Sequence, residues 1–348
     1  MQVLSESDIL LIDTSLECGE PFALIMLPGE QQPFIWTAGK NPGKDMHIHI
    51  APWLAEEGSV IHNLAPGPQT SVMTMCQTST PASHYLAAVK DISERCRTRN
   101  GKSVYSRVIC GTTDEAIGWG QRADEFFSRF PDTFRFIYFT PATLGWMGAT
   151  PEILLNFDKR SGRFSTMSLA GTRPSSAAGS WDDKNVEENN FVTEYIVAQL
   201  QDIAEEIKVS PANGLRYGSV VHLLHTISGK ADKESIPALI KAINPTPALC
   251  GIPKADAIKD ISELELHDRN CYGGYIAVDT PDRFIAFVNL RCVQFSGSRF
   301  CAYAGGGITG ASIPEDELAE TNAKLSRLLP VLTSGHNQES LSINNPII

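Results

Sequence analysis

Residues 275–307 read YIAVDTPDRFIAFVNLRCVQFSGSRFCAYAGGG, and this stretch decides the fold class. Its first four residues are strand-forming, and apolar and polar side chains alternate along residues 284–295 as in a half-buried strand. Thr280, Pro281 and Asp282 lie between these runs and form the kind of turn that joins antiparallel strands. We therefore predict an antiparallel hairpin here, followed by a further strand over residues 300–304.

Similar strand patterns recur outward from this segment at irregular intervals. Residues 9–80 are predicted as strands and loops, and further strands are predicted over residues 134–139, 144–148, 153–157 and 219–225. Apolar residues at helical spacing predict helices over residues 83–98 and 123–129. A longer helix is predicted from Asp182 or Asp183, two candidate N-caps, to about Ile207. The capping-box spacing of Ser312 and Glu315 predicts the start of a last helix, over residues 314–329.

This order of elements predicts the fold class and the domain organisation. Strands joined by hairpins, with helices interspersed at irregular intervals, favour an α+β fold over a doubly wound sheet. Neither an internal repeat nor a linker interrupts the pattern. Residues 1–348 are therefore predicted to form a single domain.

The charge balance excludes one class of partner. The chain has a formal net charge of −11 and no compensating basic stripe. A nucleic-acid-binding protein needs such a stripe to neutralise phosphates, so we expect no DNA or RNA partner. An acidic protein that binds a small dianion needs local cations or a metal ion to offset its own field.

The cysteines and the N-terminus indicate the compartment. The eight cysteines are scattered singly, without the C-x-x-C pairs of zinc or redox sites, so we expect free and mostly buried thiols. Glu6 and Asp8 stand where a signal peptide carries positive charge, and no apolar run approaches the roughly 18 residues of a membrane span. The sequence predicts a cytoplasmic protein with no membrane partner.

Two helix-borne carboxylate clusters and a glycine triplet are candidates for a binding site. Glu188 lies on the same helical stripe as apolar residues, where it either reaches the surface or is neutralised by a partner. Glu317, Glu320 and Lys324 share one face of the last helix. Such a face can belong to a binding site, or it can be an ordinary solvent-exposed face whose charges form salt bridges. The glycines at 305–307 precede that helix and would let backbone amides approach an anion. Together these features predict a magnesium and carboxylate site.

Short motifs along two thirds of the chain, from about residue 101 to 330, point to a family. Each motif is weak alone, but the ordered set resembles the chorismate-utilising family of isochorismate, salicylate, anthranilate and aminodeoxychorismate synthases. The motifs are KSVYSR (102–107), GATPE (148–152), LAGTRP (169–174), KNVEE (184–188), His222, NPTP (244–247), DR (268–269), YGG (272–274), LRC (290–292), AGGGI (304–308) and ETNAK (320–324).

The resemblance implies a fold and a set of binding residues. The fold would be α+β, with two large packed antiparallel sheets and flanking helices. Magnesium would be held by Glu188 and Glu320, with Glu317 acting through water. The remaining residues expected to bind chorismate are Thr172, His222, Tyr272, Arg291, Gly305, Gly306, Gly307 and Lys324.

The resemblance also implies a reaction, the conversion of chorismate to isochorismate. Water adds at C2 of the ring and the 4-hydroxyl leaves, which needs a base and an acid. Lys102 matches the base of the water-using members and Glu152 matches the general acid. Salicylate synthase is the nearest alternative, because it shares these residues. Lys102 disfavours anthranilate synthase component I, and Ala170 disfavours aminodeoxychorismate synthase, whose members carry a lysine there.

Some features depart from the family pattern. Asn189 stands where most members carry a histidine, Glu187 beside Glu188 leaves the ligand ambiguous by one residue, and residues 1–100 are shortened. We expect a monomer, with a homodimer as the alternative. The product would enter menaquinone or siderophore biosynthesis.

Overall fold

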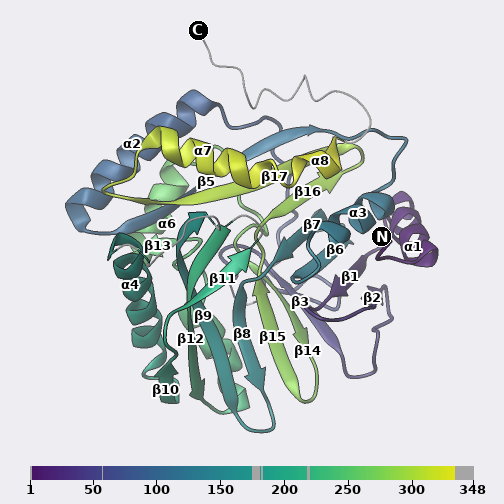
Figure 1. Ribbon diagram of the computed structural model, residues 1–348. Helices are drawn as coiled ribbons and strands as arrows, with labels where there is room; N and C mark the ends of the chain where they lie inside the picture. The colour runs from purple at the N-terminus through teal and green to yellow at the C-terminus, as the bar shows by residue number, and fades with distance from the viewer. Residues whose placement is uncertain (1, 57, 175–180, 182, 218–219, 334–348) are drawn as a thin grey trace.

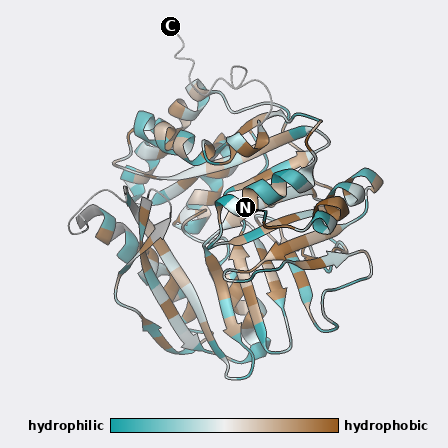
Figure 2. Cartoon of the chain, turned by 45° about the vertical axis from the view of Figure 1, so that its right-hand side comes forward, coloured by the Kyte–Doolittle hydropathy of each residue, from teal (hydrophilic) through white to brown (hydrophobic). Residues whose placement is uncertain are grey.

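The computed structural model describes residues 2–56, 58–174, 181, 183–217 and 220–333. Two large antiparallel sheets form the body of the molecule, with helices on their outer faces and edges (Figure 1). The predicted α+β fold with two packed sheets is therefore confirmed. The strands of both sheets are rich in hydrophobic residues, whereas the helices also carry hydrophilic ones (Figure 2).

Neighbouring strands within each sheet come from distant parts of the chain. The first sheet has the order β13 (Gly251–Ile252), β5 (Lys102–Thr112), β17 (Arg299–Thr309), β16 (Cys292–Ser296), β7 (Leu144–Thr150), β6 (Phe134–Thr140), β1 (Phe22–Met26) and β2 (Phe34–Thr37). The second sheet has the order β10 (Glu205–Val209), β12 (Val220–Lys230), β9 (Arg163–Pro174), β8 (Ile153–Asp158), β15 (Arg283–Val288), β14 (Tyr275–Asp279), β3 (His47–Ala51) and β4 (Ile61–His62), and β11 (Asn213–Tyr217) also pairs with β12.

The helices cover the sheets in three groups. α2 and α7 pack together against β17, α1 packs on α3 beside the first sheet, and α4 lies along β9 and β12 of the second sheet. The bounds are α1 (Glu6–Cys18), α2 (Ala82–Arg99), α3 (Trp119–Arg129), α4 (Asp183–Leu200), α5 (Ile236–Ile243), α6 (Lys254–Leu264), α7 (Pro314–Leu325) and α8 (Leu329–Leu332), with a 3₁₀ turn at Lys233–Ser235.

The largest hydrophobic cluster joins the two sheets. Phe134 of β6 stacks on Phe287 of β15, with ring centroids 4.2 Å apart and an interplanar angle of 5°. Both rings are buried, as are Phe136 and Leu154 beside them in the same cluster. Burial of such side chains supplies most of the driving force for packing the sheets face to face. This core fixes the distance between the two walls of the site described below.

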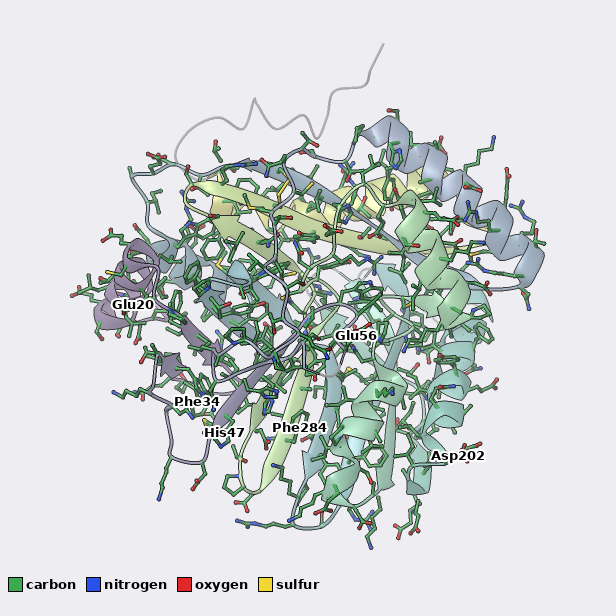
Figure 3. The ribbon with its side chains drawn as sticks, turned by 180° about the vertical axis from the view of Figure 1, so that it is seen from behind. Glu20, Phe34, His47, Glu56, Asp202 and Phe284 are labelled. Carbon is green, nitrogen blue, oxygen red and sulfur yellow. A yellow bond between two sulfur atoms is a disulfide. The ribbon has the colours of Figure 1, made fainter. Side chains whose placement is uncertain are left out.

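The antiparallel hairpin predicted around Thr280–Asp282 is confirmed. The prediction of one continuous strand over residues 284–295 is not. β14 and β15 pair antiparallel, and the backbone amide of Thr280 donates to the carbonyl of Arg283 at 2.8 Å. The hairpin end, where Phe284 is labelled in Figure 3, lies far from α2 and α7. The alternating run 284–295 divides at Asn289 and Arg291, because β15 belongs to the second sheet and β16 to the first.

Two further predictions of secondary structure were wrong. Residues 9–18, expected as strands and loops, belong to the helix α1, in which Ser5 and Asp8 make a reciprocal capping box that satisfies two orphan amides. The long helix expected to reach Ile207 ends at Leu200, because residues 205–209 pair with β12 at the sheet edge as β10. Strand pairing there outweighs the helical spacing of the apolar residues.

The C-terminal region also differs from the prediction. The triple glycine is part of β17, where Gly306 pairs with Tyr105, and is not a loop before a helix. The last helix divides into α7 and α8, and its N-cap is Ile313 without a side-chain hydrogen bond. The predicted capping box is absent, since the Ser312 hydroxyl accepts a hydrogen bond from the Thr309 amide instead.

Two further expectations can be compared with the structure. Cys110 and Cys301, cross-strand partners in β5 and β17, form a disulfide, so the expectation of free thiols throughout was wrong for this pair; the other six cysteines are free. Among the helices of the described residues, none combines the length and the apolar character needed to cross a bilayer.

Candidate active site

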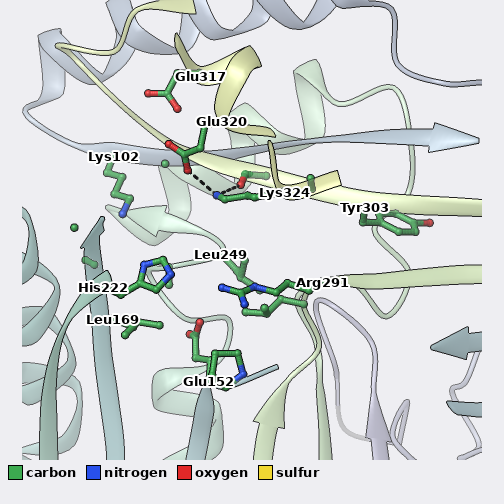
Figure 4. Close-up of a pocket in the computed structure, with 18 of the residues that line it drawn as sticks. Lys102, Glu152, Leu169, His222, Leu249, Arg291, Tyr303, Glu317, Glu320 and Lys324 are labelled. Atoms are coloured by element: carbon green, nitrogen blue, oxygen red, sulfur yellow. Dashed lines mark hydrogen bonds and ion pairs between the residues drawn. The ribbon is translucent and has the colours of Figure 1, made fainter. Parts of the chain in front are cut away.

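A cavity of about 340 Å³ lies where β5 and β17 of the first sheet face β9 and β12 of the second, beneath α7. Figure 4 shows that charged side chains from both sheets and from α7 point into it. It is lined by Lys102, Pro151, Glu152, Leu169, Ala170, Gly171, Asn185, His222, Ala248, Leu249, Tyr272, Leu290, Arg291, Tyr303, Ala304, Gly305, Gly307, Thr309, Ser312, Glu317, Glu320, Lys324 and Leu328.

Arg291 enters the cavity because the chain changes sheets at this point. Between β15 and β16 the backbone of Arg291 has φ of 51°, a conformation that costs free energy for a residue with a Cβ. The Ala149 amide donates to the Arg291 carbonyl at 3.4 Å, which links the crossing to β7. The crossing from β15 to β16 therefore places the Arg291 guanidinium in the site, and the alternating sequence pattern did not reveal this crossing.

The three consecutive glycines make room for three functional side chains. Because β17 is a regular strand here, a side chain at any of these positions would fill space that a neighbour occupies. An added Cβ would lie 2.8 Å from the Tyr272 hydroxyl at Gly305, 3.0 Å from Glu317 Oε2 at Gly306, and 2.5 Å from Lys102 Cε at Gly307. These glycines, expected to offer amides to an anion, belong to β17 and pair with β5 along one edge of that strand.

Lys102 is a buried lysine at the start of β5. Its side chain runs across Gly307, and only 6% of the residue is exposed. Its backbone pairs with Thr309 of β17 and Ile252 of β13 on either side, which fixes the strand that carries it. The predicted base therefore lies in the cavity and not on the surface turn that its position after Asn100 and Gly101 could suggest.

Glu152 is buried on the other side of the cavity, just before β8. Burial raises the pKa of its carboxyl to about 7, although the Thr246 hydroxyl and the charges of Arg291 and Lys102 act in the opposite direction. Thr246 donates to Glu152 Oε1 at 3.3 Å. A carboxyl with this pKa holds a proton near neutral pH, as a general acid requires.

His222 of β12 lies between Lys102 and Glu152 in Figure 4. Burial lowers the pKa of its imidazole to about 4, and the nearby charges of Arg291 and Lys324 act in the same direction. The ring is therefore neutral at pH 7, and it lines the cavity as the sequence analysis expected.

α7 supplies the charged upper wall of the cavity. The Lys324 ammonium lies 2.7 Å from Glu320 Oε1 and donates to the Gly305 carbonyl at 2.7 Å (Figure 4). This ammonium is the main reason that the pKa of the Glu320 carboxyl lies below its usual value. Glu317, one turn earlier on the same helix, also lines the cavity.

Tyr272 completes the wall below Gly305. It is buried and stacks on Tyr303, with centroids 5.3 Å apart and an interplanar angle of 18°. The Arg269 guanidinium lies behind it, 5.7 Å from the centroid of its ring. Its hydroxyl, held against the backbone of β17, is a candidate donor to a bound anion.

Most of the residues predicted for the site therefore line one cavity, and among the described side chains Gly306 is the exception. Gly306 is not among the lining residues, and its backbone faces Glu317. The side chains of Thr172 and Glu188 lie outside the described residues, although their backbones belong to β9 and α4. Four further lining residues had no role assigned from the sequence: Asn185, although it lies within the KNVEE motif, and Leu249, Tyr303 and Ser312.

The carboxylates at the edge of the cavity are ligands of the kind that bind a hard cation. Glu317 and Glu320 offer oxygen donors at the cavity edge, which magnesium prefers. Within the described part of the chain, no group of three or more His, Cys, Asp or Glu side chains is arranged to hold a metal ion. The third expected ligand, Glu188, is not among the described side chains, and magnesium stays a prediction.

Comparisons with known proteins agree with this geometry. A family model described as chorismate binding enzyme matches residues 42–333. The isochorismate synthase EntC of Escherichia coli (strain K12) is 33% identical over 245 residues, which cover 66% of this chain and 62% of that protein. The chain thus matches less than two thirds of the length of that relative.

Two solved structures share the fold. The menaquinone-specific isochorismate synthase MenF of Escherichia coli superposes with a TM-score of 0.74 at 18% identity, over 90% of this chain and 89% of that one. DhbC of Bacillus anthracis gives a TM-score of 0.74 at 22% identity, over 92% and 99%. These likenesses concern the arrangement of the two sheets and their helices.

Proposed function

The chain belongs to the chorismate-binding enzyme family, and from this premise we propose that it is an isomerase that converts chorismate to isochorismate. One observation carries the proposal. A buried amine, Lys102, and a buried carboxyl with a pKa of about 7, Glu152, line the same cavity as the cations Arg291 and Lys324. This combination suits a dianionic substrate that needs both an acid and a base.

The cations and donors would bind the two carboxylates of chorismate. Arg291 can hold a carboxylate through two parallel hydrogen bonds, and Lys324 and the Tyr272 hydroxyl add charge and a further donor. The backbone of residues 305–307 gives these side chains their space. Neutral His222 and the residue Thr172 would contact the ring.

The acid and the base would work on different parts of the ring. Lys102 takes a proton from the water that attacks C2, and the C2–oxygen bond forms as the ring double bond shifts. Glu152 gives its proton to the 4-hydroxyl, which leaves as water. The composition of the substrate is unchanged, so the reaction is an isomerisation.

Glu188, Glu320 and Glu317 would hold magnesium. When bound, the ion would supply positive charge for a substrate carboxylate in a protein whose net charge is −11. Lys324 already holds Glu320 in place at the edge of the cavity.

Incubation of the purified protein with chorismate and magnesium tests the proposal. We expect isochorismate as the product, identified by chromatography. Fluorescent salicylate as the main product would assign salicylate synthase instead, and anthranilate formed only with added ammonia would assign the ammonia-using reaction. Chorismate bound but left unchanged would contradict an enzymatic role.

We further propose that the protein acts in the cytoplasm as a monomer and that its product enters menaquinone or siderophore synthesis. The names of the structural relatives support these two routes, since one is menaquinone-specific and the other is 2,3-dihydroxybenzoate-specific. Deletion of the gene, followed by measurement of menaquinone and of secreted siderophore, distinguishes the routes. Light scattering coupled to size exclusion distinguishes a monomer from a homodimer.

A further inference from the structure

The lower wall of the cavity contains a β-bulge at Gly171. Pairing of β9 with β12 runs in register from Arg163 and Lys230 to Ala170 and Leu223, and then shifts, so that His222 faces Thr172. Gly171 is the extra residue, and its φ of 77° is the left-handed conformation that glycine adopts in such bulges.

The bulge decides which side chains face the substrate. Because side chains alternate along a strand, a shift of one residue in pairing moves every following side chain to the other face. His222 on β12 and the residues from Leu169 to Gly171 on β9 all line the cavity. The shape of this wall therefore depends on whether the bulge stays at Gly171.

A single asparagine from α4 donates hydrogen bonds to two backbone carbonyls directly beside the bulge. Asn189 Nδ2 donates to the Ala170 carbonyl at 3.0 Å and to the Leu223 carbonyl at 2.8 Å. These two residues are cross-strand partners in adjacent strands and form the last pair before the register shift. Asn189 is fully buried, and its Oδ1 accepts no hydrogen bond from the described residues, so its two donors hold it in place.

A second asparagine one turn earlier contacts the same bulge. An added Cβ on Gly171 would lie 3.0 Å from Asn185 Oδ1 and 3.1 Å from the Asn185 carbonyl. Residues four apart share one face of a helix, so this face of α4 rests on the bulge at two successive turns. The glycine is needed both for its backbone conformation and for the close approach of the helix.

We propose that Asn189 is a positioning residue for the substrate cavity, which acts by fixing the bulge at Gly171 and thereby the placement of His222 and of the strand from Leu169 to Gly171. An aliphatic side chain of the same size would remove both hydrogen bonds from the last strand pair before the bulge, and the register of the pairing there would no longer be fixed by α4. The role requires donors at this position and not merely volume.

The test uses two variants of Asn189 and a control on the same helix. N189L keeps the volume and removes both donors, and N189H restores a ring N–H donor. The control is T193V, because the buried Thr193 hydroxyl donates to the Asn189 carbonyl at 2.8 Å and stabilises α4 without touching the bulge. G171A disturbs the bulge by a change within β9 and leaves Asn189 intact. It provides the same test if N189L does not fold.

The first measurement is amide hydrogen exchange along β9 and β12, which does not depend on any activity. In N189L and G171A we expect exchange near residues 168–172 and 221–224 to accelerate about 10- to 100-fold, with no change near 163–166 and 227–230. In T193V this local pattern should be absent. Exchange in N189L that is unchanged, or raised equally along both strands, would overturn the proposal.

The second measurement is steady-state kinetics with chorismate, and it rests on the proposed function. At a temperature where all variants are folded, kcat/KM should fall about 100-fold in N189L, because small misplacements in a site have effects of this size. N189H should recover most of that loss, and T193V should match the wild type. Equal losses in N189L and T193V would show a general stability effect and would overturn the role. Should wild type not turn over chorismate, the exchange pattern still decides the inference.

Discussion

Two buried glutamates in this protein have pKa values shifted in opposite directions. Glu265 lies beside the cavity wall, and burial alone would raise the pKa of its carboxyl, but Arg269 and Ser106 outweigh burial and hold it below its usual value. Glu152 is buried as deeply, yet its pKa is raised to about 7. The difference shows that the partners of a buried carboxyl, and not its depth, decide whether it is structural or reactive.

The hydrogen-bond partners explain the contrast. Arg269 donates to Glu265 through Nε at 2.9 Å and Nη2 at 2.6 Å, and the Ser106 amide and hydroxyl each donate at 2.7 Å. The Arg269 guanidinium also stacks on Trp53, 4.3 Å from the ring centroid. Glu152 receives its hydrogen bond from the neutral hydroxyl of Thr246 at 3.3 Å. The first carboxyl is held as an anion, and the second keeps its proton.

The largest expected effect is on catalysis, at Glu152. E152Q removes the transferable proton and keeps the shape, so kcat should fall about 10²- to 10⁴-fold. Because no paired charge is lost, the free energy of unfolding at pH 7 should not decrease. Kinetics and urea denaturation of the same preparation check both parts. A variant with full activity, or one whose loss of activity follows a loss of stability, would remove Glu152 from the mechanism.

The next effect is on stability, at Glu265. E265Q leaves the Arg269 guanidinium buried without its counter-ion, which typically costs about 3–5 kcal/mol. The matched control is D282N, which breaks the exposed pair of Arg160 with Asp282 and should leave the free energy of unfolding almost unchanged. Comparable losses in the two variants would contradict the structural role assigned to Glu265.

The two carboxyls should also give opposite dependences of stability on pH. The folded pKa of Glu152 is raised from 4.5, so its contribution to stability is fully present below pH 4.5 and is lost as pH rises toward 7. The loss amounts to roughly 3 kcal/mol over this window. The folded pKa of Glu265 is lowered, so its contribution is present above its unfolded pKa and is lost on acidification.

Urea denaturation of wild type and E152Q between pH 4.5 and 7.5 checks this prediction. The difference between the two proteins isolates Glu152, since every other titrating group is common to both. The wild type should lose stability relative to E152Q as pH rises. Parallel curves would show that burial does not raise the pKa of this carboxyl.

The smallest effect is expected at Thr246. Its hydroxyl lowers the pKa of Glu152, so T246V should raise that pKa further and move the alkaline limb of the pH–rate profile upward. The shift should be less than about one pH unit, because a long neutral hydrogen bond contributes about 1 kcal/mol or less. A limb that moves to lower pH would contradict the assigned direction.

The sequence allowed the fold class and the charged residues that line the cavity to be predicted, because motifs and strand patterns are local. It did not reveal that the run 284–295 divides between two sheets, since alternation is the same in either sheet, and this division places Arg291. The glycine triplet was recognised for its backbone amides, but the space that its missing side chains provide was not foreseen. Each glycine clears space for a side chain from a distant segment, which is a tertiary property.

Predictions for individual elements failed where tertiary pairing decided the outcome. Ile207 has helical spacing with the residues of α4, yet it belongs to a strand because the edge of β12 offers hydrogen bonds. The contrast between Glu152 and Glu265 also could not be predicted, because Arg269 was recognised only as part of a motif. Its hydrogen bonds to Glu265 become visible only in the folded chain.

The central claim is that Glu152 keeps its proton near neutral pH in a cavity shared with Lys102. The most direct measurement is the titration of its side-chain carboxyl by carbon NMR in glutamate-labelled protein, with E152Q to assign the signal. We expect a midpoint near pH 7. A midpoint at or below the ordinary value of 4.5 would show an ionised carboxylate throughout the working range and would contradict its role as the acid.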